Sequence, residues 1–88
     1  MSSESRIIAC QIHDYVEIAC LFKLSVKLQL TDGSELTGVA QDTMTRPDKT
    51  EVLQLESAGS QVQVGLHEID VMFAVTDNPH FERVDFGS

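Results

Sequence analysis

The sequence lacks the features that mark several large protein classes. It has no tryptophan, only two cysteines, and 6 basic residues against 14 acidic ones in a chain of 88 residues. No apolar run approaches the ~20 residues of a membrane-spanning helix, and the polar N-terminal segment does not resemble an export signal. We therefore exclude a two-domain enzyme, a membrane-spanning protein and a secreted disulfide scaffold. We expect one cytoplasmic domain over residues 1–88, with a loose terminus at residues 1–6.

The shortage of basic residues gives the chain a formal net charge of −8. Affinity for nucleic acids comes mainly from Lys and Arg side chains that displace counterions, and anionic membranes likewise attract basic segments. We therefore expect neither a nucleic acid nor a membrane as a direct ligand. The acidity either keeps a small protein soluble or favours a basic surface on another protein, and composition alone leaves both interpretations open.

The two cysteines are too few for a disulfide framework. Cys10, His13 and Cys20 form a Cys-x2-His-x6-Cys pattern, but structural zinc sites normally have four ligands in paired spacing. The other histidines, His67 and His80, lie far away in the sequence. Free, buried cysteines are the simpler interpretation, so we expect no metal and no other cofactor.

No catalytic motif stands out in the chain. It contains no Gly-x-Ser-x-Gly elbow, no phosphate-binding glycine loop and no His-Glu-x-x-His segment. His13 and Asp14 are adjacent, but no nucleophile is tied to them by a known turn. We therefore expect a binding protein without catalytic residues, and keep a small enzyme or metal protein as the less favoured alternative.

Residues 11–22 form the one segment with helical periodicity. Its apolar side chains recur at i, i+3, i+4 and i+7, the spacing of one helical face, at Tyr15, Ile18, Ala19 and Phe22. A helix of this length is not stable alone. We therefore expect it to lie on a sheet.

Asp14 and Glu17 stand three residues apart at the front of that segment, which is the spacing of a capping box. This spacing predicts a helix that begins at about Asp14 and runs for about two turns. The two carboxylates could also project from an exposed face toward a basic partner, because a cap leaves one carboxylate oxygen free. We expect His13 to precede the helix and to be exposed, and Tyr15 to lie in the core or at an interface edge.

The rest of the chain alternates apolar and polar residues in short runs separated by turn residues. The pattern predicts strands at residues 24–30, 35–42, 50–56, 61–66 and 70–75, and a last extended segment at 81–86. Gly38 suggests a bulge or sharp bend. Short, evenly spaced strands usually close into a small barrel or a strongly bent sheet. The predicted fold is therefore mainly β with one N-terminal helix, in a small, strongly bent antiparallel barrel of five or six strands.

The longest predicted connection runs from residue 43 to residue 49. It is mixed in charge, and Pro47 ends strand pairing. Most loops of this kind are only solvated connections. Its length nevertheless makes it the second candidate for partner contacts, after the helix.

The segment CQIHDYVEIAC at residues 10–20 resembles the signature of the Rof family, the Rho-binding antiterminators. The resemblance continues over nearly the whole chain, in residues 24–33, 36–43, 51–56, 64–69 and 78–86. Gln11 stands where the family commonly has an acidic residue, so no role is carried over to position 11.

The resemblance implies an Sm-like fold and an inhibitor of Rho-dependent transcription termination. Such a protein binds the basic primary RNA-binding region of the Rho N-terminal domain and blocks RNA loading. We expect the Rho-binding residues to be His13, Asp14, Tyr15 and Glu17 of the helix, followed by Arg46, Asp48 and Lys49 of the long loop. We also expect a monomer when the protein is free. The alternative is an Sm-like module that binds RNA directly, which a charge of −8 disfavours.

Overall fold

The computed structural model describes residues 10–86, with side chains from Ile12 onward. Within this range the elements are α1 (Cys10–Leu21), β1 (Ser25–Leu30), β2 (Glu35–Thr45), β3 (Glu51–Ser57), β4 (Ser60–Gly65), the 3-10 helix η1 (Leu66–Glu68), β5 (Ile69–Ala74) and β6 (Arg83–Asp85). The predicted loose terminus lies outside it, as does the side chain of Cys10. No helix of the described residues is long and apolar enough to cross a membrane.

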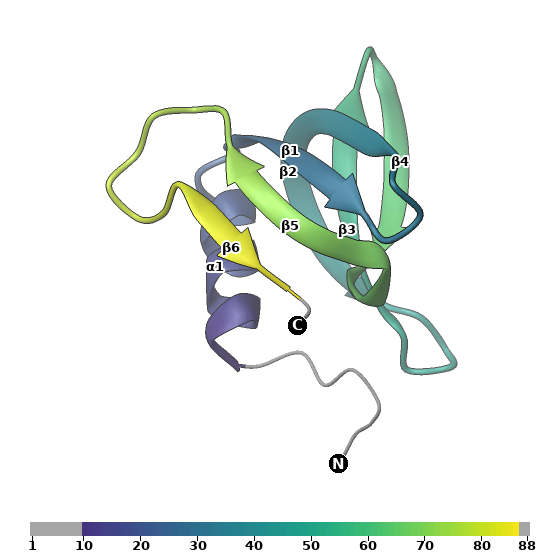
Figure 1. Cartoon of the computed structure of the whole chain (residues 1–88). Helices are drawn as coiled ribbons and strands as arrows, with labels where there is room; N and C mark the ends of the chain where they lie inside the picture. Colours follow the sequence, from purple (N-terminus) through teal and green to yellow (C-terminus); the bar gives the residue numbers. More distant parts are fainter. Residues whose placement is uncertain (1–9, 87–88) are drawn as a thin grey trace.

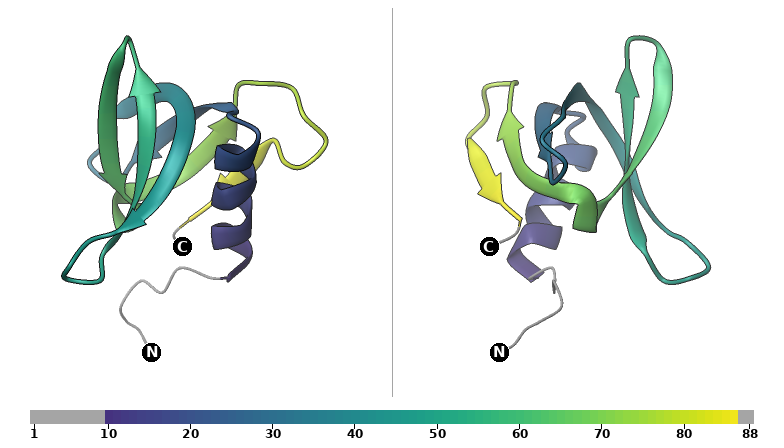
Figure 2. Two further views of the ribbon diagram at one scale, coloured as in Figure 1. Left: turned by 180° about the vertical axis from the view of Figure 1, so that it is seen from behind. Right: turned by 45° about the vertical axis from the view of Figure 1, so that its right-hand side comes forward.

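The six strands of this range form one antiparallel sheet in the order β4-β3-β2-β1-β5-β6. The sheet bends strongly, so that β3 and β4 lie on one side of the molecule and β5 and β6 on the other (Figure 1). Helix α1 lies between these two halves and contacts β2 and β6 (Figure 2). The predicted mainly β, Sm-like fold with one N-terminal helix is therefore confirmed.

The core lies between α1 and the sheet. The helix contributes Val16, Ala19 and Cys20, and the strands contribute alternate residues such as Leu28 and Leu53, all of them buried. Burying an aliphatic side chain of this size stabilises the fold by about 1.5–3 kcal/mol. No polar or charged side chain is buried anywhere in residues 12–86, so the helix is held on the sheet by apolar packing.

Helix α1 begins one turn earlier than predicted, at Cys10 instead of Asp14. Asp14 is therefore the fifth residue of the helix, and the predicted capping box with Glu17 is wrong, because only the first turn has free backbone N–H groups. His13 likewise lies within the helix and does not precede it. The physical reason is Ile12, which packs against the core and extends the inward-facing stripe by one turn.

The end of α1 changes the direction of the chain abruptly. The backbone N–H of Leu24 donates to the carbonyl of Ala19 at 2.9 Å, and that of Lys23 donates to the carbonyl of Cys20 at 3.2 Å. Lys23 adopts φ +52°, the left-handed backbone conformation that glycine usually adopts just after the end of a helix. Because the helical spiral stops here, Phe22 does not join the predicted apolar face and is 54% exposed.

Strand β2 is longer than predicted and runs to Thr45 instead of ending at Asp42. Its last residues pair with β3, up to Thr45 opposite Glu51. Residues 43–45, which the sequence predicted as part of a loop, are paired in the strand. The connection between the two strands is therefore only residues 46–50. This shorter connection is a tight turn rather than a long, open loop.

Gly38 does not carry the predicted bulge. The register of β2 against β3 shifts between Ala40 and Asp42 instead. A Cβ atom at Gly38 would lie 2.8 Å from the carbonyl oxygen of Glu56, so glycine is needed there for the close approach of two strands in the bent part of the sheet.

Candidate functional site

The outer face of α1 consists of Asp14, Glu17, Ile18 and Leu21, which follow one another at i, i+3, i+4 and i+7 and line a shallow hollow. Asp14 and Glu17 are both exposed. Neither carboxylate has a hydrogen-bond or ion-pair partner within the described residues. Two unpaired carboxylates beside two apolar side chains are therefore available to a partner.

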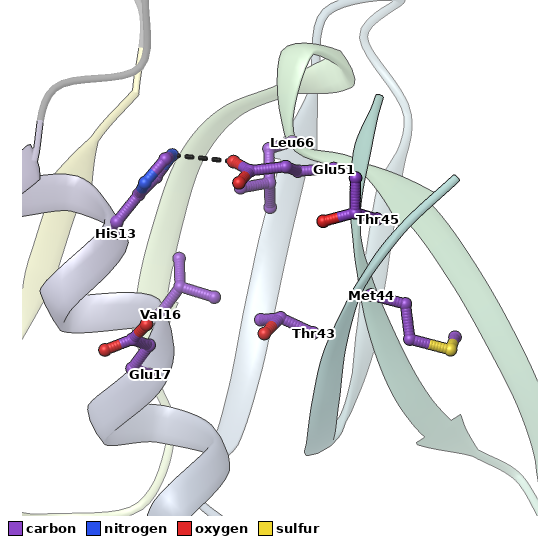
Figure 3. A pocket seen from close by; sticks show the side chains of 8 residues that line it. All are labelled: His13, Val16, Glu17, Thr43, Met44, Thr45, Glu51 and Leu66. Carbon is purple, nitrogen blue, oxygen red and sulfur yellow. Dashed lines mark ion pairs between the residues drawn. The ribbon is translucent and has the colours of Figure 1, made fainter. Parts of the chain in front are cut away.

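A groove separates α1 from the paired ends of β2 and β3. It is lined by His13, Val16 and Glu17 of the helix and by Thr43, Met44, Thr45, Glu51 and Leu66 from the other side (Figure 3). Val16 and Leu66 are buried, so the floor is apolar and the rim is polar. The groove joins one edge of the acidic helix to the β2–β3 turn.

His13 and Glu51 face each other across this groove (Figure 3). Nε2 of His13 lies 2.8 Å from Oε1 of Glu51. Nε2 is shielded from solvent and is not aligned for a regular hydrogen bond, so the contact is a close electrostatic approach. The two side chains are 35% and 43% exposed, so His13 is less exposed than the sequence predicted. A pair this exposed contributes less than about 1 kcal/mol.

The turn at residues 46–50 is held together from within. Oδ1 of Asp48 accepts a hydrogen bond from the backbone N–H of Thr50 at 2.9 Å, and this bond lowers the pKa of Asp48 below its ordinary value. The backbone N–H of Arg46 donates to the carbonyl of Thr50 at 2.8 Å, and the N–H of Lys49 donates to that of Arg46 at 2.7 Å. Asp48 therefore shapes the turn, while the side chains of Arg46 and Lys49 are exposed.

The structure brings most of the sequence-predicted residues to one surface. Lys49 lines a second hollow together with His13 and Glu51, so the turn adjoins the groove beside the helix. Tyr15 lies elsewhere: its ring packs edge-on against Phe81, with centroids 5.6 Å apart, and it is partly buried. Tyr15 is thus the core-edge aromatic that the sequence suggested, and it lines none of these hollows.

Thr43, Met44 and Thr45 lie in the connection that the sequence suggested for partner contacts but were not named as site residues. Four further lining residues were not predicted to belong to a site: Glu51, Leu66, Ile18 and Leu21. Ile18 and Leu21 share a face of α1 through helical spacing, whereas the residues of β2 and β3 meet through strand pairing. Met44 and Thr45 were assigned to a loop, although the run Thr-Met-Thr has the β-branched residues that favour a strand. Glu51 gave no signal, because its role depends on the register that places β3 opposite the helix.

The described residues offer no reactive or metal-binding cluster. No group of three or more His, Cys, Asp or Glu side chains in this range could hold a metal ion. Burial raises the pKa of the Cys20 thiol to about 11, and the Asp42 carboxylate adds to this effect. Cys20 is therefore a protonated core residue at neutral pH, as the sequence predicted for a buried cysteine.

Known proteins share both this sequence and this fold. The family model described as "Modulator of Rho-dependent transcription termination (ROF)" matches residues 7–86. Protein rof of Escherichia coli strain K12 is 33% identical over 69 residues, which are 78% of this chain and 81% of that protein. Protein rof of Shigella flexneri matches with the same values.

A solved structure from Vibrio cholerae O395, described as YaeO bound to magnesium, has a TM-score of 0.77 and 36% sequence identity, and the match covers 83% of this chain and 95% of that one. The family model spans nearly all of the helix and sheet described above. The chain therefore belongs to the Rof family, the modulators of Rho-dependent transcription termination.

Proposed function

We propose that this protein inhibits Rho-dependent termination by binding Rho directly with the outer face of α1. The target is the basic primary RNA-binding region of the Rho N-terminal domain, so that bound protein prevents RNA from loading. Asp14 and Glu17 pair with the Lys and Arg side chains that otherwise hold RNA phosphates, since carboxylates and phosphates both form charge-assisted hydrogen bonds with these groups.

One observation carries this proposal: Asp14 and Glu17 are exposed, and have no ion-pair partner among the described residues, on a helix whose opposite side is anchored in the core. A rigid helix presents both charges without further ordering, so little entropy is lost on binding. The net charge of −8 also attracts a basic surface before contact is made.

The groove and the β2–β3 turn widen the proposed contact. His13 lies at the edge between α1 and the groove, and Arg46 and Lys49 extend from the turn on its other side. These two basic side chains would meet acidic or carbonyl groups that flank the basic region of Rho. Tyr15 lies apart from these hollows, so its part in the proposed contact is to hold α1 in place through its packing on Phe81.

The test is a binding titration of purified Rho with three forms of the chain: unmodified, Glu17→Lys and Glu56→Lys. Glu56 is another exposed acid, on β3 and away from the helix, so it controls for net charge. Reversing a charge in a close pair costs at least about 2 kcal/mol, or roughly 30-fold in affinity. We expect Glu17→Lys to weaken Rho binding by this factor and to lose termination inhibition in a transcription assay, with an unchanged melting temperature.

Two results would contradict the proposed site. One is that Glu56→Lys weakens binding as much as Glu17→Lys, because overall charge and not the helix would then be responsible. The other is that unmodified protein and RNA occupy the same Rho subunit together without competition. Binding should also weaken as ionic strength rises, because salt screens charge pairs.

Direct RNA binding by an Sm-like module is the second candidate function. The observation in its favour is a cluster of two cations and one aromatic ring on three paired strands. The ammonium group of Lys27 on β1 lies 5.5 Å from the ring centre of Phe73 on β5, and the guanidinium group of Arg83 on β6 lies 5.7 Å from it. However, Arg83 pairs with Asp85 at 3.0 Å, and Lys27 lies 3.8 Å from Glu35. Both cations are thus partly neutralised, which weakens any attraction for phosphate.

Fluorescence anisotropy with single-stranded RNA at physiological salt separates the two functions. We expect no binding by the chain alone at micromolar concentration. Micromolar or tighter binding, lost in Phe73→Ala, would favour the RNA-binding module, because base stacking on an aromatic ring contributes about 1–3 kcal/mol.

A further inference from the structure

The large apolar side chains that are exposed among the described residues lie at the end of α1 and in the connection that follows β5. Leu21 is 73% exposed, Phe22 is 54% exposed and Val75 is 59% exposed. Leu21 and Phe22 end α1, and Val75 begins the connection from β5 to β6. Its backbone N–H donates to the carbonyl of Ser25 at 2.8 Å, which brings this connection beside the end of the helix (Figure 2).

The ring of Phe22 is held in its exposed position. It stacks on His80, with ring centroids 5.1 Å apart and an angle of 15° between the planes. The backbone around His80 is fixed in turn, because Oδ1 of Asn78 accepts hydrogen bonds from the N–H groups of His80 at 2.8 Å and Phe81 at 3.1 Å. An apolar surface ordered in advance loses little entropy when a partner covers it.

We define the end patch as Leu21, Phe22, Val75 and His80. It is continuous with the outer face of α1, since Leu21 belongs to both and shares a hollow with Asp14 and Glu17. Asp77 and Glu82, in the same connection as Val75 and His80, are also exposed. Acidic side chains therefore border the patch along the helix and along the β5–β6 connection.

The acidic side chains around the end patch favour a basic partner protein over a second copy of this chain. A second copy of this chain would bring two such borders together in a protein of net charge −8, and like charges at an interface are costly. Lys23, the residue after Phe22, directs its ammonium group to the carbonyl of Gln41 at 3.1 Å. A partner that fits presents an apolar pocket or ridge surrounded by Lys and Arg side chains.

We propose that the end patch is the apolar half of the Rho-binding surface, in contact with apolar side chains that adjoin the basic region of Rho. This inference rests on the proposed function and adds a second component to it. The carboxylates of Asp14 and Glu17 supply an attraction that salt screens, whereas burial of Leu21 and Phe22 supplies one that salt does not weaken. The complex therefore keeps part of its affinity at high ionic strength.

The experiment measures Rho binding at several salt concentrations for the unmodified chain, a Leu21→Ser/Phe22→Ser double variant and Gln63→Ser. Both replaced side chains are more than half exposed, and melting temperatures verify that each form is folded. Gln63 is an exposed residue of β4, remote from α1. We expect the double variant to bind roughly tenfold or more weakly at every salt concentration, with an unchanged dependence on salt, while Gln63→Ser binds normally.

Three outcomes would overturn the inference. If the unmodified chain binds Rho and the double variant binds equally well, the inference fails and the proposed function stands. If the unmodified chain dimerises, the double variant is monomeric and their affinities for Rho are equal, the occupant of the patch is a second copy. If the unmodified chain does not bind Rho at all, the proposed function fails and this inference fails with it.

Discussion

The two sides of helix α1 differ in almost every physical respect. The inner side, with Val16, Ala19 and Cys20, is buried and apolar. Asp14 and Glu17 on the outer side are exposed and have no ion-pair partner among residues 12–86. The inner side accounts for why the helix is ordered at all, since a 12-residue helix is marginal alone. The outer side contributes little to stability and is free to be selected for binding.

Because the two sides differ in this way, the stability of the fold and the binding of a partner can be tested separately on one short helix. A change on the inner side should alter the free energy of unfolding, and a change on the outer side should alter binding. The predictions below challenge this separation, beginning with the largest expected effect.

Ala19→Asp should unfold the domain or destabilise it by at least about 3 kcal/mol, because it places an unpaired charge at a site with 0% exposure. Glu17→Ala, two residues away, should change stability by less than about 0.5 kcal/mol. Chemical denaturation followed by circular dichroism measures both. Similar losses in the two variants would show that the outer side also supports the fold.

Lys23→Gly should stabilise the domain by up to about 1 kcal/mol, because glycine adopts a positive φ without the strain of a side chain. Lys23 holds φ +52° at the end of α1. The measurement is the denaturation midpoint, with Lys23→Ala as a control that keeps a Cβ atom. A loss of stability in both variants would mean that the bond from the Lys23 ammonium to Gln41 outweighs the backbone strain.

The contact between His13 and Glu51 should contribute less than about 1 kcal/mol, because the two side chains are still 35% and 43% exposed. A double-mutant cycle with His13→Ala and Glu51→Ala isolates this coupling energy. A coupling energy above about 2 kcal/mol would mean that His13, at the groove edge of α1, stabilises the fold instead of serving mainly in binding.

Cys20 should make stability fall as the pH rises from about 9 to about 11. Burial raises the pKa of this thiol from 9.0 to about 11, so above pH 9 the unfolded chain loses the proton while the folded chain keeps it. Stability is then fully present below pH 9 and declines until the folded pKa is passed. Denaturation of a Cys10→Ser form against pH measures this slope. An equal slope after Cys20→Ala would assign it to other groups.

Periodicity predicted the helix, most of its buried side and the positions of the strands along the chain, because apolar spacing reports directly which face meets the core. It could not locate the helix start, since Asp14 and Glu17 have the spacing of a cap and equally that of two outward residues in mid-helix. Neither could it foresee Phe22 on the surface, which follows from the left-handed turn at Lys23.

The candidate site was only partly predictable for a related reason. Asp14 and Glu17 are adjacent on one helix, so their common face follows from sequence spacing. Glu51 and Thr43 reach the groove through the register of β2 and β3, which includes a shift between Ala40 and Asp42. A one-residue change in register would turn these side chains to the opposite face, and no local pattern specifies where the shift falls.

The absence of buried polar or charged side chains throughout residues 12–86 has a consequence for how such a protein can be redesigned. Every Asp, Glu, Lys, Arg and His side chain in that range reaches the exterior, so the sign of its charge can be changed without rebuilding the interior. The Cys20 thiol is buried but stays protonated at neutral pH. A version carrying lysines in place of most exterior carboxylates should keep the same architecture while repelling what it formerly attracted. The same fold could therefore carry different distributions of surface charge and bind partners of different charge.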